Sequence, residues 1–328
     1  MELVTKKKLI LVAGRGHKEL SLELARHLQV PLGELVLSTF ANGEIYCRFG
    51  ESIRGGDVFI FQTHCEPIND RLVEQLLMID AAKRASAKRI TAVCPFYGYA
   101  RQDRKAEGRE PISARLVADM LSVAGADRVV TVDLHTGQIQ GFFDYPVDHL
   151  TAVPVIAEYL GSVLVGEVTI VSPDAGGGKL ARRYASWLEE HTVLDPELAF
   201  IDKRRPKGTH NVAEATEVVG EVAERTCVIV DDMIDTAGTV VSAANLLRKR
   251  GAASVVIAAT HGLLSGPAID RLKNAPVREV VVTDTLPVAQ EKRFDSLRVL
   301  SIAPLLGEAI DAVFEDGSVS ELFGGDNL

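Results

Sequence analysis

The chain has 328 residues, of which 47% are hydrophobic and 25% are charged. This composition excludes a disordered or fibrous protein, and the length is typical of two domains. Acidic residues outnumber basic ones by 45 to 36, which gives a formal net charge of −9. This charge and an aromatic content of only 5% argue against a nucleic-acid-binding protein. An anionic ligand would therefore have to be bound by local clusters of cations.

The sequence predicts neither a membrane span nor a secretion signal. No apolar run reaches the roughly 18 residues that a spanning helix needs. The apolar run 9–13 is too short for the core of a signal peptide. The four cysteines form no CxxC pair and no metal-ligand spacing with histidine. We therefore expect buried thiols in a cytoplasmic protein that has no membrane partner.

In the first half of the chain, short β-branched runs alternate with amphipathic segments. The predicted strands are 9–13, 58–62, 90–94 and 129–132, and the predicted helices are 18–28, 68–85 and 113–122. Residues 41–49, with Asn42-Gly43 at their start, are expected to form an antiparallel hairpin flap.

The same alternation restarts after about residue 150. The predicted strands are 168–171, 199–201, 227–230, 255–259 and 280–282, and the predicted helices are 153–160, 179–190, 239–250 and 266–274. This spacing indicates an α/β fold of mainly parallel sheets flanked by helices. We expect two domains, 1–150 and 151–328, with the last helix packing back on the first domain.

Two glycine-rich segments come close to known phosphate-binding motifs without matching them. Gly176-Gly177-Gly178-Lys179 is followed by leucine and has no glycine at the upstream position of a P-loop. Gly14-Arg15-Gly16 follows a predicted strand, but Glu19 occupies the third glycine position of a dinucleotide fingerprint. We assign neither segment to phosphate binding.

The most informative segment is 227–239, in which an apolar strand leads into Asp231-Asp232, then a loop of small residues, then a helix. Backbone amides, hydroxyl groups and the helix dipole at such a loop suit a phosphate. The carboxylates suit the vicinal hydroxyls of a ribose, which donate charge-assisted hydrogen bonds. Alternatively, one acid ends the strand and Asp235 or Thr239 caps the helix, but this explains one acid rather than three.

Segment 227–239 resembles the phosphoribosyl-diphosphate-binding loop of type I phosphoribosyltransferases and of ribose-phosphate pyrophosphokinases. Three further segments, 97–105, 133–143 and 201–206, are similar to the second family, and the likeness extends over about residues 9–323. The resemblance implies two phosphoribosyltransferase-like domains. It also implies transfer of the diphosphoryl group of ATP to the anomeric hydroxyl of ribose 5-phosphate, giving phosphoribosyl pyrophosphate and AMP.

The resemblance also assigns roles to individual residues. The implied catalytic residues are Lys203 and Arg205, and the implied Mg²⁺ ligands are His135 and Asp174. The implied ATP-binding residues are Phe40, Asn42, Glu44, Arg101, Gln102 and His135. The implied ribose-5-phosphate-binding residues are Asp231, Asp232, Asp235, Thr236, Ala237, Gly238 and Thr239. The chain departs from the family at Asn42, where aspartate is usual, and at Ala175, where many members have histidine.

The physical chemistry of these residues suits the implied reaction. Attack at the β-phosphorus of ATP concentrates negative charge, so catalysis depends on positioning and cations. Lys203, Arg204, Arg205 and Lys207 are predicted to lie in one loop, although a solvent-exposed surface is the alternative. Arginine offers a planar fork for phosphate, phenylalanine can stack on adenine, and an aspartate suits magnesium.

Two other functions are compatible with parts of the sequence. A phosphoribosyltransferase would need 231–239 but would leave Arg101-Gln102 and 133–143 unexplained. A catalytically silent regulatory homologue should have lost catalytic cations or the metal ligand, yet Lys203, Arg205, His135 and Asp174 are present. The family also implies a homo-oligomer, a hexamer. Its flap reaches a neighbouring subunit's ATP site, which would require at least a dimer.

Overall fold

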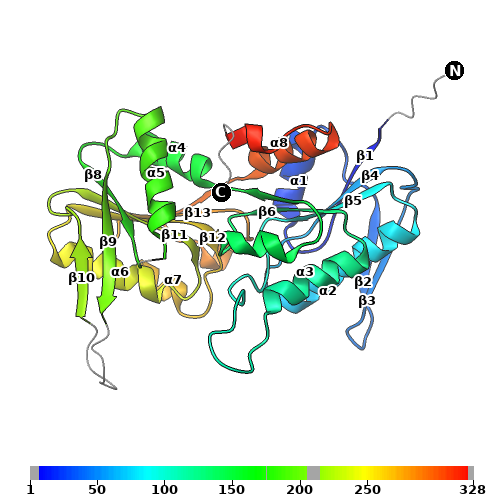
Figure 1. Cartoon of the computed structure of the whole chain (residues 1–328), viewed down its shortest axis with the longest axis horizontal. Helices are drawn as coiled ribbons and strands as arrows, with labels where there is room; N and C mark the ends of the chain where they lie inside the picture. The colour runs from blue at the N-terminus through cyan, green and yellow to red at the C-terminus, as the bar shows by residue number, and fades with distance from the viewer. Residues whose placement is uncertain (1–6, 175, 205–214, 324–328) are drawn as a thin grey trace. The chain divides into compact units, whose positions relative to one another are not determined.

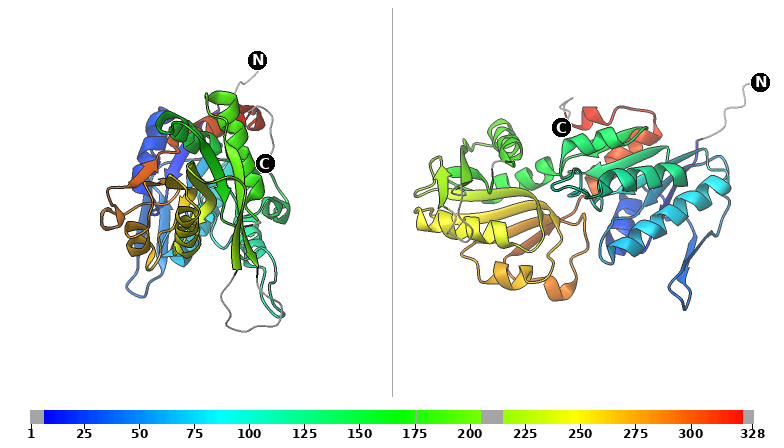
Figure 2. Two further views of the ribbon diagram at one scale, coloured as in Figure 1. Left: turned by 90° about the vertical axis from the view of Figure 1, so that its left-hand side faces the viewer. Right: turned by 60° about the horizontal axis from the view of Figure 1, so that its bottom comes forward.

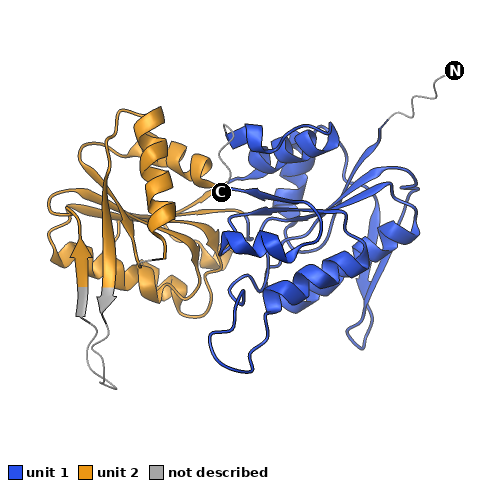
Figure 3. Ribbon diagram, viewed as in Figure 1, with its two compact units in different colours: residues 1–151, 285–287, 301–328 blue, residues 152–284, 288–300 orange. Residues whose placement is uncertain are grey.

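The structure is a computed structural model that describes residues 7–174, 176–204 and 215–323. The chain divides into two compact units, coloured separately in Figure 3. Unit 1 comprises Met1–Thr151, Thr285–Pro287 and Ser301–Leu328, and unit 2 comprises Ala152–Asp284 and Val288–Leu300.

Unit 1 is built on a five-stranded sheet in which all neighbouring strands are parallel. Its spatial order is β1 (Leu9–Ala13), β4 (Asp57–Phe61), β5 (Arg89–Cys94), β6 (Arg128–Val132) and β7 (Val147–Leu150). Every residue of β4 is buried, as expected for a parallel strand that is covered on both faces.

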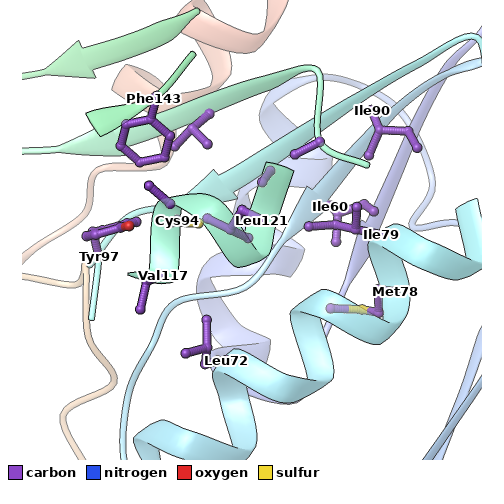
Figure 4. Packing of buried hydrophobic residues seen from close by; sticks show 14 of the residues in the cluster. Ile60, Leu72, Met78, Ile79, Ile90, Cys94, Tyr97, Val117, Leu121 and Phe143 are labelled. Carbon is purple, nitrogen blue, oxygen red and sulfur yellow. The ribbon is translucent and has the colours of Figure 1, made fainter. Parts of the chain in front are cut away.

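Helices cover both faces of this sheet (Figure 1). On one face α1 (Lys18–His27) packs against α8 (Ala303–Phe314), and on the other α2 (Ile68–Arg84) packs against α3 (Ser113–Ala124). Figure 4 shows the core beneath α2 and α3. A methyl group at Gly307 of α8 would lie 2.1 Å from Cδ2 of His27, so glycine allows α1 and α8 to approach closely. The last long helix therefore belongs to unit 1.

An antiparallel hairpin of β2 (Leu35–Thr39) and β3 (Ile45–Phe49) forms a separate two-stranded sheet. β3 packs against α2, and the tip of the hairpin projects beyond the helix (Figures 1 and 2). The sequence predicted a hairpin over residues 41–49 and placed Asn42-Gly43 at the start of that segment. Instead, these two residues lie in the turn, and the first strand of the hairpin precedes them. Gly43 has a φ of +94°, which a glycine adopts readily at such a turn.

Unit 2 has a seven-stranded sheet in which every neighbouring pair is parallel except β9 with β10. Its order is β10 (Ala215–Val219), β9 (Glu197–Arg204), β8 (Val168–Ser172), β11 (Thr226–Ile234), β12 (Ser254–Gly262), β13 (Glu279–Thr283) and β14 (Leu297–Leu300). The chain proceeds outwards from β8 in one direction and from β11 in the other. The sheet therefore has a topological switch point between β8 and β11, where α/β proteins bind ligands.

In the described part of unit 2, four α-helices flank this sheet (Figure 1). α4 (Val153–Val163) packs against α5 (Gly178–His191), and α6 (Gly238–Lys249) packs against α7 (Ala268–Lys273). Short 3₁₀ helices occur at Gly137–Phe142, Gln290–Lys292 and Ser320–Phe323. The predicted α/β class with mainly parallel sheets and a small antiparallel flap is confirmed.

Within the described residues, no helix is both long enough and apolar enough to cross a bilayer. All four cysteines are free thiols, and Cys65, Cys94 and Cys227 are buried.

Candidate active site

The acidic pair lies at the switch point of unit 2. Pairing of β11 with β8 ends at Ile229, whereas pairing with β12 continues to Ile234. Asp231 and Asp232 therefore lie within β11 rather than after its end, which corrects the sequence prediction. Beyond Ile229 the strand is paired with β12 alone on the described part of its edges, so partly buried carboxylates can occupy an otherwise buried strand.

Asp231 is in an electrostatically unfavourable environment. Burial, reinforced by the neighbouring charge of Asp232, raises the pKa of Asp231 from its ordinary value of 3.8 to about 8. Asp174 adds a smaller repulsion, and the backbone amide of Asp232, which donates to Asp231 Oδ1 at 2.9 Å, opposes the rise. Acids crowded in this way are typical of a site that binds cations or hydroxyl donors.

The loop of small residues after β11 leads directly into α6. Ala237 has a φ of +59°, a left-handed conformation that is unusual for alanine and occurs at functional turns. Nη1 of Arg271 donates to the carbonyl oxygen of Thr236 at 2.9 Å and supports the loop from α7. No side chain of the described residues caps the start of α6, so the amides of its first turn suit an anion.

Asp174 follows β8 across the switch point and is exposed. Its Oδ1 accepts hydrogen bonds from the amides of Gly176 at 2.8 Å and Gly177 at 3.1 Å, which orient the carboxylate. The Coulomb interaction of Asp174 with Asp231 places both acids in one electrostatic environment. The departure from the family at Ala175 lies outside the described residues.

The predicted nucleotide-binding residues Arg101 and Gln102 lie on the exposed loop between β5 and α3 of unit 1. Ser113 Oγ donates to the side-chain oxygen of Gln102 at 2.6 Å, which fixes the amide orientation. His135 follows β6 and is also exposed. Both loops follow strands that the sequence predicted, at 90–94 and 129–132.

Asp103 connects the loop that carries Arg101 with the loop that follows His135. It is 8% exposed, and its Oδ2 accepts from Thr136 Oγ1 at 2.8 Å and from Gln138 Nε2 at 2.9 Å. Asp103 lies within the segment 97–105, but the sequence analysis assigned it no role. Its position as the one acid in the basic run 101–105 could have marked it as a structural contact.

The remaining predicted ATP-binding residues are at the exposed tip of the hairpin. Phe40 is 54% exposed and meets Tyr46 edge to face, with ring centroids 6.0 Å apart. Asn42 Oδ1 accepts from the amide of Glu44 at 3.1 Å, so the asparagine that departs from the family shapes the turn. The tip therefore presents an aromatic ring and a carboxylate to solvent.

The predicted basic loop is partly a strand. Lys203 and Arg204 are the last residues of β9 and pair with Thr216 and Ala215 of β10. This corrects the prediction that all of these cations lie in a loop, because an antiparallel partner extends the strand through them. Arg205 and Lys207 lie outside the described residues.

Within the described part of the chain, no group of three or more histidine, cysteine, aspartate or glutamate side chains is arranged to hold a metal. The chemistry of the acids at the switch point nevertheless suits a hard cation, because carboxylate oxygens are preferred by magnesium. Asp174 has two amide donors on one oxygen. A bound cation would offset the burial and the repulsion by Asp232 that together raise the pKa of Asp231.

The fold and the site together define a two-unit α/β protein with paired acids and a loop of small residues at the switch point of its second sheet. Residues 9–125 match the model for the N-terminal domain of ribose phosphate pyrophosphokinase, and residues 196–324 match the phosphoribosyl synthetase-associated domain. A ribose-phosphate pyrophosphokinase of Bifidobacterium longum is 56% identical over 97% of this chain and 93% of the relative. One from Mycobacterium tuberculosis is 54% identical over 98% of this chain and 97% of the relative.

The crystal structure of phosphoribosylpyrophosphate synthetase from Mycobacterium smegmatis is also similar. It aligns with a TM-score of 0.89 and 54% identity over 95% of this chain and 100% of that one. The chain therefore belongs to the ribose-phosphate pyrophosphokinase family, as its motifs indicated.

Proposed function

We propose that this chain transfers the diphosphoryl group of ATP to the C1 hydroxyl of ribose 5-phosphate. The products are 5-phosphoribosyl 1-pyrophosphate and AMP, and the role is in nucleotide biosynthesis. The observation that carries the proposal is 56% identity to a ribose-phosphate pyrophosphokinase over nearly the whole chain. The acidic strand and the α6 loop give that activity a physical basis.

In this proposal the C-terminal domain, 151–328, binds the sugar. The carboxylates of Asp231 and Asp232 accept hydrogen bonds from the ribose hydroxyls, and the 5-phosphate lies at the start of α6. There Thr236 and Thr239 supply hydroxyl donors, while Ala237 and Gly238 leave room for the phosphate to approach the backbone. Asp235 is assigned to the same loop. Supporting features are the uncapped helix start and the strained backbone of Ala237.

The N-terminal domain, 1–150, is assigned to ATP. Arg101 binds phosphate oxygens, Gln102 reads the base edge, and His135 contributes to the same nucleotide site. From the flap, Phe40 stacks on the adenine of a neighbouring subunit's ATP, together with Asn42 and Glu44. The exposure of the flap tip and of the Arg101 loop supports this assignment, because a ligand-binding side chain must be accessible.

Mg²⁺ is the proposed cofactor, with Asp174 and His135 as its protein ligands. Magnesium usually keeps several waters and is held by one or two protein groups together with substrate phosphates. When bound, the ion would neutralise charge on the transferring phosphates. Lys203 and Arg205 are the proposed catalytic cations, which stabilise the negative charge that develops during transfer.

We also propose a homo-oligomer, a hexamer in the family, in the reducing cytoplasm. The flap supports an oligomer because Phe40 at its tip is exposed and the β2–β3 ribbon projects from unit 1 (Figure 1). The free thiols support a reducing compartment.

One assay separates this function from its alternatives. Purified protein is incubated with ribose 5-phosphate and Mg-ATP, and nucleotides and sugar phosphates are separated. AMP formed together with phosphoribosyl pyrophosphate is the expected result. ADP alone would indicate an ordinary kinase, and no turnover would favour a silent regulatory homologue. In a parallel incubation with phosphoribosyl pyrophosphate and a nucleobase, consumption of both would indicate a phosphoribosyltransferase.

Replacing Asp103 should weaken ATP use selectively. In Asp103→Ala the hydrogen bonds from Thr136 and Gln138 are lost, so the Arg101 loop is no longer fixed to the loop after β6. We expect KM for ATP to rise roughly tenfold and KM for ribose 5-phosphate to stay within about twofold. Glu107→Ala, an exposed acid on the same loop, is the matched control. Equal increases in both KM values would contradict the assignment.

A further inference from the structure

We propose that Arg15, in the segment Gly14-Arg15-Gly16, is a positioning residue for the tip of the β2–β3 hairpin. This segment lies between β1 and α1, and the function described above does not use it. The consequence for ATP binding rests on the proposed function, because that function assigns Phe40, Asn42 and Glu44 to the nucleotide.

Arg15 is anchored by a buried carboxylate. The side chain of Glu74 on α2 is 0% exposed and accepts from the backbone amide of Arg15 at 2.6 Å and from its Nε at 2.5 Å. Gln62 Nε2 donates to the same carboxylate at 2.8 Å, and Arg71 Nη1 lies 3.7 Å from it. A buried carboxylate requires such partners, and in return it fixes the plane of the Arg15 guanidinium.

The two glycines of the segment make room for this anchor. A Cβ at Gly14 would lie 2.6 Å from the side chain of Gln62, and one at Gly16 would lie 2.7 Å from the carbonyl oxygen of Thr63. The amide of Gly16 donates to Gln62 Oε1 at 2.9 Å, which holds Gln62 against Glu74. The glycines therefore serve close packing around a buried polar cluster.

The guanidinium extends from this cluster to the hairpin. Arg15 Nη1 donates to Thr39 Oγ1 at 3.0 Å, and Thr39 is the last residue of β2, directly before Phe40. The hairpin strands pair with each other and not with the main sheet, so side chains must hold the hairpin in place. Apolar residues such as Leu35 and Phe49 do this at its base, whereas Ser38, Thr39 and Phe40 are exposed.

A fixed hairpin tip lowers the entropy cost of binding a ligand there. The tip is closed by Phe40 N donating to Glu44 O at 2.8 Å and Gly43 N donating to Phe40 O at 2.8 Å. The base of the ribbon packs against the core, but its tip does not, and a two-stranded ribbon alone is only marginally stable. A charged donor near the tip therefore restricts the motion of the tip. Loss of this donor should weaken ATP binding without affecting the chemistry on the sugar.

The first test compares Thr39→Val, Thr39→Ser and Arg15→Lys by steady-state kinetics. We expect Thr39→Val and Arg15→Lys to raise KM for ATP roughly three- to tenfold, with kcat and KM for ribose 5-phosphate within about twofold. Lysine keeps the charge but lacks the fork that bonds both Glu74 and Thr39. Thr39→Ser keeps the hydroxyl and should restore the KM for ATP. Ser38→Ala, which removes the neighbouring exposed hydroxyl, is the matched control.

The second test does not depend on activity. Amide hydrogen exchange at Phe40 and Gly43 should accelerate about three- to tenfold in Thr39→Val and Arg15→Lys, but not in Ser38→Ala or Thr39→Ser. Unchanged exchange in Thr39→Val would overturn the positioning role of Arg15. Faster exchange with an unchanged KM for ATP would uphold the contact but refute its link to the nucleotide. If the native protein lacked the proposed activity, the exchange result alone would decide.

Discussion

Lys203→Ala should lower kcat for phosphoribosyl pyrophosphate formation by about 10² to 10³-fold, which is typical for removal of one group that stabilises transition-state charge. KM for ribose 5-phosphate should stay within about threefold, because the proposed sugar site is on β11 and α6 rather than on β9. Lys203 is the penultimate residue of β9 and pairs with Thr216 of β10, so the strand fixes the position of its backbone. AMP release under saturating Mg-ATP is the measurement.

The control for this variant is Lys249→Ala, which removes an equal charge from the exposed end of α6 in the same unit. It should retain nearly the native kcat. If both variants lost activity equally, the effect would arise from net charge rather than from catalysis. A near-native kcat in Lys203→Ala would remove that residue from the catalytic role.

The central strands were predictable because they are buried on both faces. Continuous apolar runs identify β1, β4 and the first part of β11. Helical spacing identifies α1 and α2, with bounds correct to within a residue or two. The chain also encodes its hairpin turn in Asn42-Gly43. These local signals determine the α/β class.

The missed elements lack such signals. β7 spans Val147–Leu150 and β14 spans Leu297–Leu300, and both are short edge strands whose polar residues conceal the pattern. β10 was missed for a different reason, since it is the antiparallel partner that extends β9 through Lys203. Pairing between segments determines these strands, and composition cannot reveal it.

The sugar loop could be predicted as a motif, but its electrostatics could not. Adjacent acids in a sequence are ordinarily ionised and solvated. To predict the raised pKa of Asp231, one must know that β11 continues past its pairing with β8 and buries the carboxyl beside Asp232. Asp103 and Arg15 similarly acquire roles only through partners more than 20 residues away, Thr136 and Glu74.

Asp231→Asn should stabilise the ligand-free protein and weaken sugar binding. The pKa of Asp231 rises on folding from 3.8 to about 8, so the folded state binds the proton more tightly than the unfolded state. The contribution of this group to stability is therefore greatest at low pH and is lost as pH increases from about 4 to about 8. Asparagine does not titrate, so above pH 8 the variant should unfold at a temperature roughly 2–5 °C higher.

The affinity for ribose 5-phosphate should change with pH in the direction opposite to the stability. Ribose hydroxyls donate more strongly to an ionised carboxylate than to a neutral one, so the native affinity for ribose 5-phosphate should increase between pH 7 and pH 9. The phosphate group, with a second pKa near 6, is already dianionic in this range. In Asp231→Asn the affinity should be about tenfold weaker at pH 9 and nearly independent of pH. Titration calorimetry with ribose 5-phosphate alone measures both.

Opposite signs for stability and affinity distinguish a binding role from a structural one. If the Asp231 carboxylate only supported β11, its replacement would lower the stability of the protein. If it is instead a buried ligand-binding group repelled by Asp232, its replacement should raise the stability of the ligand-free protein. Asp195→Asn, at an exposed acid of the same unit, should change neither quantity. Destabilisation of Asp231→Asn at pH 9, or a native pH profile for its sugar binding, would show that the acid does not bind the ribose.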